Sequence, residues 1–342
     1  TQQKDKARPA VYQLADAGHG EAAVRAAAFL EEPPLTLALM ERFAKAANTA
    51  DERAEWYKRL GDENARQGRL DNAAAAYAEA IAARPDRRLQ LEDDLARIFA
   101  RGGRPDDAAR ICLPRLAAAA APLDESERSR LDMLYDAFRQ ADALGRLAER
   151  VRQALAGSPK SPALHLLLAK ALENTVPGES LDALAKACAL MPADQDLGMQ
   201  LAAALHAAGR HAESAAAFQK ASVGRKLAPP QYQAWADALA RIGKDEDAAR
   251  VAARAAFDLG DTAESHDTAA RIYVSAGRPA EAVRHYLRLA QLLQSDTRRG
   301  EITAALARLY RQTNQLDEAE KCSRDMLKSA DERLRYEAAL AL

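Results

Sequence analysis

Aromatic residues are scarce in this sequence and make up only 5% of its 342 positions. Hydrophobic residues nonetheless account for 48%, so the apolar content consists mainly of alanine and leucine. Alternating runs of Val, Ile and Thr, which are typical of β-strands, are missing. Alanine and leucine are strong helix formers, and small side chains let helices pack closely. The composition therefore predicts an all-α fold.

Other shortages exclude further classes of protein. The 49 basic and 50 acidic residues nearly cancel, whereas a dedicated nucleic-acid-binding protein needs clustered positive charge. No run of about 18 apolar residues occurs, so we expect no membrane span in this sequence. Cys112, Cys188 and Cys322 lie far apart in helical stretches. They indicate buried thiols, not a disulfide framework or a metal site.

The two ends of the sequence suggest a piece of a longer polypeptide. The start, TQQKDKARPAVY, has no Met and no signal-peptide pattern. The end, RLRYEAALAL, stops inside a helical pattern that has no capping residue. We therefore expect further sequence beyond both ends, and the compartment cannot be inferred from targeting signals.

A short motif recurs along the chain. A glycine, a polar pair, a small residue and a bulky residue follow one another from Gly68, Gly103, Gly209, Gly243 and Gly277, and the last three glycines are spaced by 34 residues. A period of this length is typical of a solenoid. Apolar residues at helical spacing on both sides of each glycine predict two helices joined by a turn. Glycine suits the left-handed conformation that ends a helix, and units that cannot bury their apolar faces alone stack on one another.

Residues 54–87, AEWYKRLGDENARQGRLDNAAAAYAEAIAARPDR, are similar to a known repeat. They resemble the tetratricopeptide repeat at Tyr57, Leu60, Gly61, Gly68, Ala73, Tyr77, Ala80 and Pro85, and depart from it at Asn64. The resemblance implies a right-handed α-solenoid of tandem helix–turn–helix units. An array of about eight such units is expected over residues 54–333. After the first unit, the expected frames are 89–122, 128–161, 161–194, 195–228, 229–262, 263–296 and 300–333.

The remaining residues fit partial units. We expect residues 1–53 to form N-terminal helices of partial or degenerate repeats, and 334–342 to begin a truncated further repeat. Frame 128–161 is degenerate because Asp142 and Leu147 replace the glycine and alanine, while Asn314 replaces the glycine of the last frame. Irregular joints occur at 113–127, 175–180 and 295–300, where proline and glycine are expected to end helices.

Signatures of catalysis or cofactor binding are weak. GHGEAA at 18–23 matches a dinucleotide-binding pattern, but it follows a predicted helix instead of a strand. His206 and His211 flank the turn at Gly209 without a third metal ligand. Pairs of acidic residues lie beside arginines, as on solvated helix surfaces. We therefore predict a non-enzymatic protein with no cofactor, no bound metal and no small-molecule ligand.

The family resemblance implies a groove, lined by the first helix of each unit, that binds protein partners. Carried over position by position, the groove residues are His165, Ala169, Leu172, Met199, Ala203, His206, Asp237, Arg271, Arg308 and Arg311, with Gln233 and Asp267 beside them. Two interpretations of the middle part of this groove remain open. Leu172 and Met199 could form an apolar floor for a partner helix, or the apolar stretch HLLLAKAL could be buried against its neighbours.

One known use of such grooves is excluded by a charge. The resemblance implies a clamp of Lys, Asn and Arg side chains that holds the terminal carboxylate of a partner. Lys58 fits its first position, but Asp62 stands where the amide is needed and would repel the ligand. We therefore expect no chaperone-type carboxylate binding.

The functional prediction is a protein–protein interaction scaffold that binds a partner peptide or helix within a bacterial multiprotein assembly. High Ala and Arg usage in a long array resembles bacterial envelope scaffolds, including those of exopolysaccharide export, and this favours the periplasm over the cytoplasm. The alternative is a regulatory or substrate-recruiting region of a larger enzyme whose catalytic domain is absent from this sequence. The full reading frame, continued into a membrane barrel or into an enzyme motif, separates the two.

Overall fold

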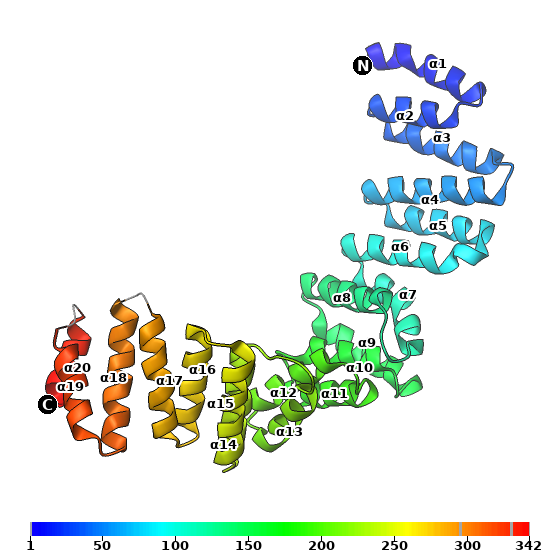
Figure 1. Ribbon diagram of the computed structural model, residues 1–342. Helices are drawn as coiled ribbons and strands as arrows, with labels where there is room; N and C mark the ends of the chain where they lie inside the picture. Colours follow the sequence, from blue (N-terminus) through cyan, green and yellow to red (C-terminus); the bar gives the residue numbers. More distant parts are fainter. Residues whose placement is uncertain (1, 294–295, 329–330, 342) are drawn as a thin grey trace. The chain divides into compact units, whose positions relative to one another are not determined.

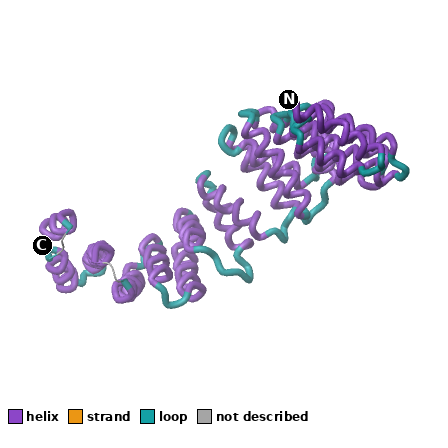
Figure 2. The backbone as a smooth tube through the Cα atoms, turned by 90° about the horizontal axis from the view of Figure 1, so that it is seen from above, coloured by secondary structure: helices purple, strands orange, loops and turns teal. Residues whose placement is uncertain are grey.

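The alanine- and leucine-rich sequence forms helices along its whole described length. The structure is a computed structural model that describes residues 2–293, 296–328 and 331–341. Every element of regular secondary structure in these residues is helical, which confirms the all-α prediction (Figure 2). The chain divides into two parts, residues 1–190 and 191–342, which we call unit 1 and unit 2. Each is a stack of helices and is described separately.

Unit 1 consists mainly of antiparallel helix pairs (Figure 1). Its helices are α1 (Gln2–Asp16), α2 (Gly20–Phe29), α3 (Pro33–Ala46), α4 (Ala50–Arg66), α5 (Leu70–Ala83), α6 (Arg88–Arg101), α7 (Pro105–Ala118), α8 (Glu125–Gln140), α9 (Leu144–Gly157), α10 (Pro162–Leu172) and α11 (Pro177–Leu190), with a short 3₁₀ helix at Pro85–Arg87. Helix α3 lies between two pairs and packs on both α2 and α4.

Unit 2 repeats the same arrangement (Figure 1). Its helices are α12 (Gln195–Ala207), α13 (His211–Ala221), α14 (Pro229–Arg241), α15 (Asp245–Leu259), α16 (Ala263–Ser275), α17 (Pro279–Leu292), α18 (Asp296–Gln312), α19 (Leu316–Met326) and α20 (Glu332–Ala341). From α4 onward each expected frame contains one helix pair, from α4 and α5 in 54–87 to α18 and α19 in 300–333. In every pair the first helix is even-numbered.

In seven of the eight pairs from α4 onward, all but α10 and α11, the turn has the backbone conformation expected of a glycine. The φ angles of the five motif glycines are 73°, 73°, 74°, 74° and 66° at Gly68, Gly103, Gly209, Gly243 and Gly277. Asp142 and Asn314 replace glycine with φ angles of 50° and 57°. Residues that carry a Cβ are strained in this region, and Asn and Asp tolerate it best. The turns therefore share one geometry even where the glycine is lost.

Small residues let the two helices of a pair approach each other. The alanines five positions after the turn, Ala73, Ala108, Ala248 and Ala282, are fully buried. Gly61 shows how close the approach is, because a Cβ added there would lie 2.5 Å from Cδ2 of the buried Tyr77 ring. Since a ring cannot yield that distance without repacking, Gly61 is required by the packing of α4 on α5.

Helix α7 ends within the expected joint 113–127, at Ala118, but not at the first proline of that joint. Pro114 lies inside α7, which continues to Ala118, and Gly300 lies inside α18, which begins at Asp296. Proline removes only one hydrogen bond, and the neighbouring Leu113 and Leu116 are buried, so packing holds the helix across it. Glycine costs a helix only about 1 kcal/mol relative to alanine. The start of the expected joint 295–300 lies outside the described residues.

Candidate partner-binding surface

The groove positions expected on α10 are buried. The relative exposures of His165, Ala169 and Leu172 are 7%, 4% and 3%. Every residue of α10 except Lys170 is buried, and the helix packs on α7, α8, α9 and α11. The ring Nε2 of His165 lies 2.8 Å from the carbonyl oxygen of Pro159. The apolar sequence of α10 is thus explained by packing within unit 1.

Met199 is also buried, and Ala203 is exposed. Met199 on α12 is 5% exposed and belongs to the apolar core of unit 2, with Phe218, Tyr232 and Trp235. Ala203 lies one turn further along α12 and faces solvent. The burial of Leu172 and Met199 favours the second of the two interpretations, in which these side chains stabilise the repeats and do not contact a partner.

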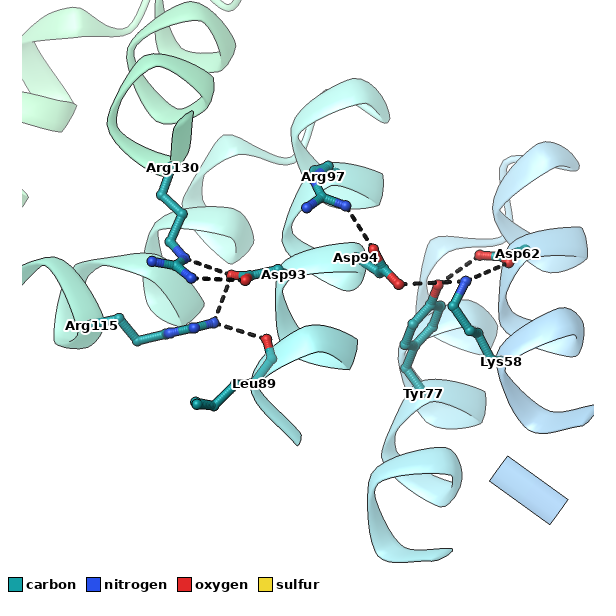
Figure 3. A network of polar contacts seen from close by, with 9 residues as sticks. All are labelled: Lys58, Asp62, Tyr77, Leu89, Asp93, Asp94, Arg97, Arg115 and Arg130. Carbon is teal, nitrogen blue, oxygen red and sulfur yellow. Dashed lines mark hydrogen bonds and ion pairs between the residues drawn. The ribbon is translucent and has the colours of Figure 1, made fainter. Parts of the chain in front are cut away.

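In unit 1 the charged side chains of the first helices are bonded to one another (Figure 3). Nζ of Lys58 lies 3.2 Å from Oδ2 of Asp62 and 3.4 Å from Oδ2 of Asp94. The hydroxyl of Tyr77 donates a hydrogen bond of 2.6 Å to Asp62, and Arg97 lies 2.6 Å from Asp94. Burial, and next the hydrogen bond to Asp62, raise the pKa of Tyr77. Lys58 is therefore paired with two carboxylates of unit 1.

Asp93 is the centre of a second cluster in unit 1 (Figure 3). Nε of Arg130 and Nη1 of Arg115 lie 2.7 Å and 2.6 Å from its Oδ1, and Arg115 also donates to the carbonyl oxygen of Leu89. The side chains of Asp93, Arg115 and Arg130 are 15%, 18% and 12% exposed. Burial, and next Asp93, raise the pKa of the Cys112 thiol to about 12, so it is unreactive at neutral pH. The cluster joins α6, α7 and α8.

In unit 2 the first helices α14, α16 and α18 carry a different set of charges, which we call the unit 2 surface. Asp267 lies near its middle and is 14% exposed. Its carboxylate accepts from Arg271 on its own helix, at 3.1 Å, and from Arg298 on α18, at 3.2 Å. A cavity of about 410 Å³ lies beside it. Its lining includes Gln233, Glu264, Asp267, Thr268, Leu293 and Arg298.

Arg308 and Arg311 on α18 differ from the paired arginines of this surface. Nε of Arg308 contacts only the carbonyl oxygen of Ala304, at 3.4 Å on its own helix, and Arg311 donates to Oγ of Ser323 on α19. Among the described residues neither has a carboxylate partner, and both are exposed.

Tyr286 on α17 shows that these charges lie close enough to act together. Burial, followed by the carboxylate of Asp267, raises the pKa of its hydroxyl, while Arg271 and Arg308 lower it. One buried hydroxyl is therefore within electrostatic reach of charges on both α16 and α18.

His206 and Asp237 connect this surface to α12. Nε2 of His206 lies 3.5 Å from Oδ2 of Asp237, and Nε of Arg241 lies 3.6 Å from Oδ1. The ring centroids of His206 and His211 are 5.4 Å apart, and Nδ1 of each is buried without a hydrogen bond. In the part of the chain that the structure describes, no three His, Cys, Asp or Glu side chains are placed to hold a metal ion.

The expected groove residues differ in their exposure. Arg271, Arg308 and Arg311 are exposed and Asp237 is half-buried, which leaves them available to a partner. Arg298 was not anticipated because it lies in the first turn of α18, where the sequence indicated a joint. Its place on a helix, though not its contact with Asp267, could have been found from the helical spacing of Ile302, Leu306 and Leu309, which are buried on one face of α18.

No described helix is both long enough and apolar enough to cross a membrane. Residues 265–300 match the family model described as tetratricopeptide repeat. A comparison with curated proteins gives no match.

Several solved structures are similar to the chain. The C-terminal part of a TPR repeat-containing protein from Cytophaga hutchinsonii has 11% identity and a TM-score of 0.46, over 82% of this chain and 98% of that one. YrrB, a TPR protein with an unusual peptide-binding site, has 14% identity and a TM-score of 0.42, over 56% and 99%. PilW, a type IV pilus biogenesis factor, has 15% identity and a TM-score of 0.40, over 63% of this chain and 99% of that one. These likenesses are weak, and we draw no conclusion about function from them.

Proposed function

We propose that this chain, a tetratricopeptide repeat protein, is a non-enzymatic scaffold whose unit 2 surface binds an acidic segment of a protein partner. The observation that carries the proposal is the pair Arg308 and Arg311, both exposed and without a carboxylate partner among the described residues. Guanidinium groups bind carboxylates through directed hydrogen bonds, so these two are suited to Asp or Glu side chains of a partner.

The cavity between α14 and α16 supports the same site. Its volume of about 410 Å³ is enough for a side chain of the partner, and Leu293 and Thr268 give it an apolar part. Asp267 at its edge is already neutralised by Arg271 and Arg298, so it does not repel an acidic segment. The partner segment is therefore expected to place an apolar residue in the cavity and carboxylates toward α18.

The test is capture of partners from a bacterial lysate by the chain, followed by mass spectrometry and by binding of the captured segment as a synthetic peptide. Replacing Arg308→Glu together with Arg311→Glu should weaken that peptide by about tenfold or more, since two attractions become repulsions. Binding of the unchanged chain should fall as salt is raised, because exposed charges are screened.

A matched control separates local from general charge effects. Arg250→Glu with Arg324→Glu makes the same change on the second helices α15 and α19, where both arginines are exposed. This control should bind the peptide as the unchanged chain does. Equal loss in the two double variants, or a captured segment without acidic residues, would contradict the proposal.

The assembly is a separate and finer proposal. The high Ala and Arg content of a long repeat array supports a bacterial multiprotein assembly, such as envelope polysaccharide export, as the setting. The full reading frame tests it: continuation into an outer-membrane barrel supports the envelope, and continuation into a catalytic motif supports instead a recruiting region of a larger enzyme. Mass spectrometry of the captured partners provides the second measurement.

A further inference from the structure

Two histidines join the helices of one repeat in unit 2 through their rings. Nδ1 of His266 on α16 lies at a hydrogen-bond distance of 2.9 Å from Nδ1 of His285 on α17. The ring of Tyr273 stacks on His285 with centroids 5.4 Å apart, and the side chain of His266 is 15% exposed. The contact thus belongs to the packing of α16 on α17.

A carboxylate determines which ring nitrogens carry protons. Nε2 of His266 lies 2.8 Å from Oδ1 of Asp261, and the guanidinium of Arg288 contacts the same carboxylate at 2.5 Å and 3.1 Å. Arg288, and next His266, lower the pKa of Asp261, so the carboxylate is ionised at neutral pH. Because an ionised carboxylate only accepts, Nε2 of His266 carries a proton. When both rings are neutral, Nδ1 of His266 therefore accepts from the Nδ1–H of His285.

The contact between the rings limits how many protons the pair can take up. One added proton can be placed on Nε2 of His285, and the resulting imidazolium still donates from its Nδ1 to His266. A second added proton puts an N–H on both Nδ1 atoms, and two donors cannot share a contact of 2.9 Å. Two positive rings also repel each other at this separation. The folded contact therefore accommodates one added proton and excludes two.

We propose that His266 and His285 form an acid-sensitive joint, which holds α17 on α16 near neutral pH and releases it when both rings are protonated. In the unfolded chain each imidazole takes up a proton at the ordinary histidine pKa of about 6.5. Below that pH the unfolded chain binds one more proton at these two residues than the folded chain does, so acid favours unfolding. Because α16 also carries Asp267 and Arg271, the joint belongs to a repeat that forms part of the unit 2 surface.

The surroundings of His285 act in the same direction. Burial, and next the neighbouring His266, lower the pKa of His285. A histidine whose pKa is lowered by folding contributes stability that is complete above the ordinary histidine pKa. This contribution is lost as the pH falls toward the lowered pKa. Tyr273 stays neutral over this range, because burial, and next Glu281, raise the pKa of its hydroxyl.

The neighbouring helices do not supply a charge to the pair. Helix α16 packs on α14 and α15, and α17 packs on α18. Charged side chains of these neighbours are bonded elsewhere, namely Asp237 to Arg241 on α14, Asp258 to Arg254 on α15, and Arg298 of α18 to Asp267. Within the described residues, no side chain of α14, α15 or α18 makes a hydrogen bond, an ion pair or a ring contact with either imidazole. The response to pH therefore depends on the two rings, Asp261 with its partner Arg288, and Tyr273.

Urea unfolding of the full chain near pH 7 and near pH 5, followed by circular dichroism, tests the joint. Between these pH values the unfolding equilibrium constant of the unchanged chain should rise about tenfold more than that of His285→Gln, since one proton contributes up to tenfold per pH unit. His266→Gln should reduce the acid sensitivity in the same way, because it also leaves a single imidazole. Carboxylates and the other histidines titrate in all these proteins, so their effects cancel in the comparison.

His19→Gln is the matched control. His19 is an exposed histidine of unit 1 whose side chain makes no capping hydrogen bond. This variant should keep the acid sensitivity of the unchanged chain. A loss of sensitivity equal to that of His285→Gln would show that any histidine has the effect, and it would contradict the joint.

A second measurement needs no variant, so it decides the case even where His285→Gln does not fold. In an NMR titration of the histidine rings of the unchanged chain, His285 should stay neutral at a pH where His19 is already protonated. Protonation of His266, His285 and His19 together overturns the proposal. Equal acid sensitivity in the unchanged chain and in a folded His285→Gln chain overturns it as well.

Discussion

The first helices of unit 1 and unit 2 carry the same kinds of charged residue but use them differently. In unit 1, Asp93 bonds to Arg115 and Arg130, whose side chains are 18% and 12% exposed. In unit 2, Asp267 is as buried as Asp93, at 14%, but its partners Arg271 and Arg298 are 57% and 51% exposed. The buried arginines of unit 1 join repeats, whereas the arginines of unit 2 that pair with Asp267 are largely exposed to solvent.

The largest expected effect on stability concerns a side chain that is buried in unit 1. Leu172→Asp places a carboxylate where the side chain is 3% exposed, and it should lower the free energy of unfolding by about 3 kcal/mol or more. Ala203→Asp on the exposed part of α12 should change it by less than about 0.5 kcal/mol. Urea unfolding followed by circular dichroism measures both. A folded, equally stable Leu172→Asp chain would restore the apolar floor as a partner site.

The next effect compares the two carboxylates directly. Asp93→Asn leaves two nearly buried guanidinium groups without their counter-charge, so it should cost about 2–3 kcal/mol. Asp267→Asn removes an equally buried carboxylate, but its partners Arg271 and Arg298 are exposed and can be solvated by water. It should therefore lower the free energy of unfolding by about 1 kcal/mol or less. The same urea experiment measures the difference. Equal costs would show that arginine exposure does not distinguish the two units.

A smaller effect compares turns with and without glycine. Gly277→Val in unit 2 puts a β-branched residue at a φ of 66° and should cost about 1–2 kcal/mol. Asp142→Gly in unit 1 removes the Cβ at a position whose φ is already 50°. It should therefore leave the free energy of unfolding unchanged or raise it slightly. Thermal unfolding of the two variants is the measurement. No loss in Gly277→Val would mean that the turn can change conformation without strain.

The smallest expected effect is a pH dependence. The hydrogen bond from Arg152 lowers the pKa of Glu179, and this ion pair joins α9 to α11. Because the pKa of Glu179 is lower in the folded chain than in the unfolded chain, its ionised form stabilises the fold at pH values above the ordinary glutamate pKa. This contribution disappears as the pH falls through the lowered pKa. Arg152→Gln should therefore reduce stability slightly at pH 7 and not at pH 3. Because both side chains are largely solvated, only a parallel pH series of the two proteins can resolve the change.

Local features were predictable because they depend on neighbouring residues. The spacing of Gly209, Gly243 and Gly277 reflects the length of two helices and a turn, and the steric freedom of glycine explains each turn. Asn314 was correctly expected to adopt the same conformation, with a φ of 57°. Pro114 and Gly300 lie inside helices because buried leucines and isoleucine on the same helices outweigh a single unfavourable residue.

The candidate site depended on information that the sequence pattern does not hold. Repeat position places Ala169 and Arg308 at the same point on a first helix, yet Ala169 is 4% exposed and Arg308 faces solvent. The difference comes from how tightly neighbouring helices cover α10 and α18. Arg298 pairs with Asp267 across 31 positions of sequence, and no local pattern indicates that contact.

The sequence by itself determined the helices, their pairing and the turn conformation, since propensity, periodicity and backbone sterics act over a few residues. Only the tertiary structure decided which charges are consumed inside unit 1, which remain exposed in unit 2, and that His266 meets His285. Exposure and contact between helices arise from packing among residues distant in the chain, and small shifts in that packing bury one side chain and release another.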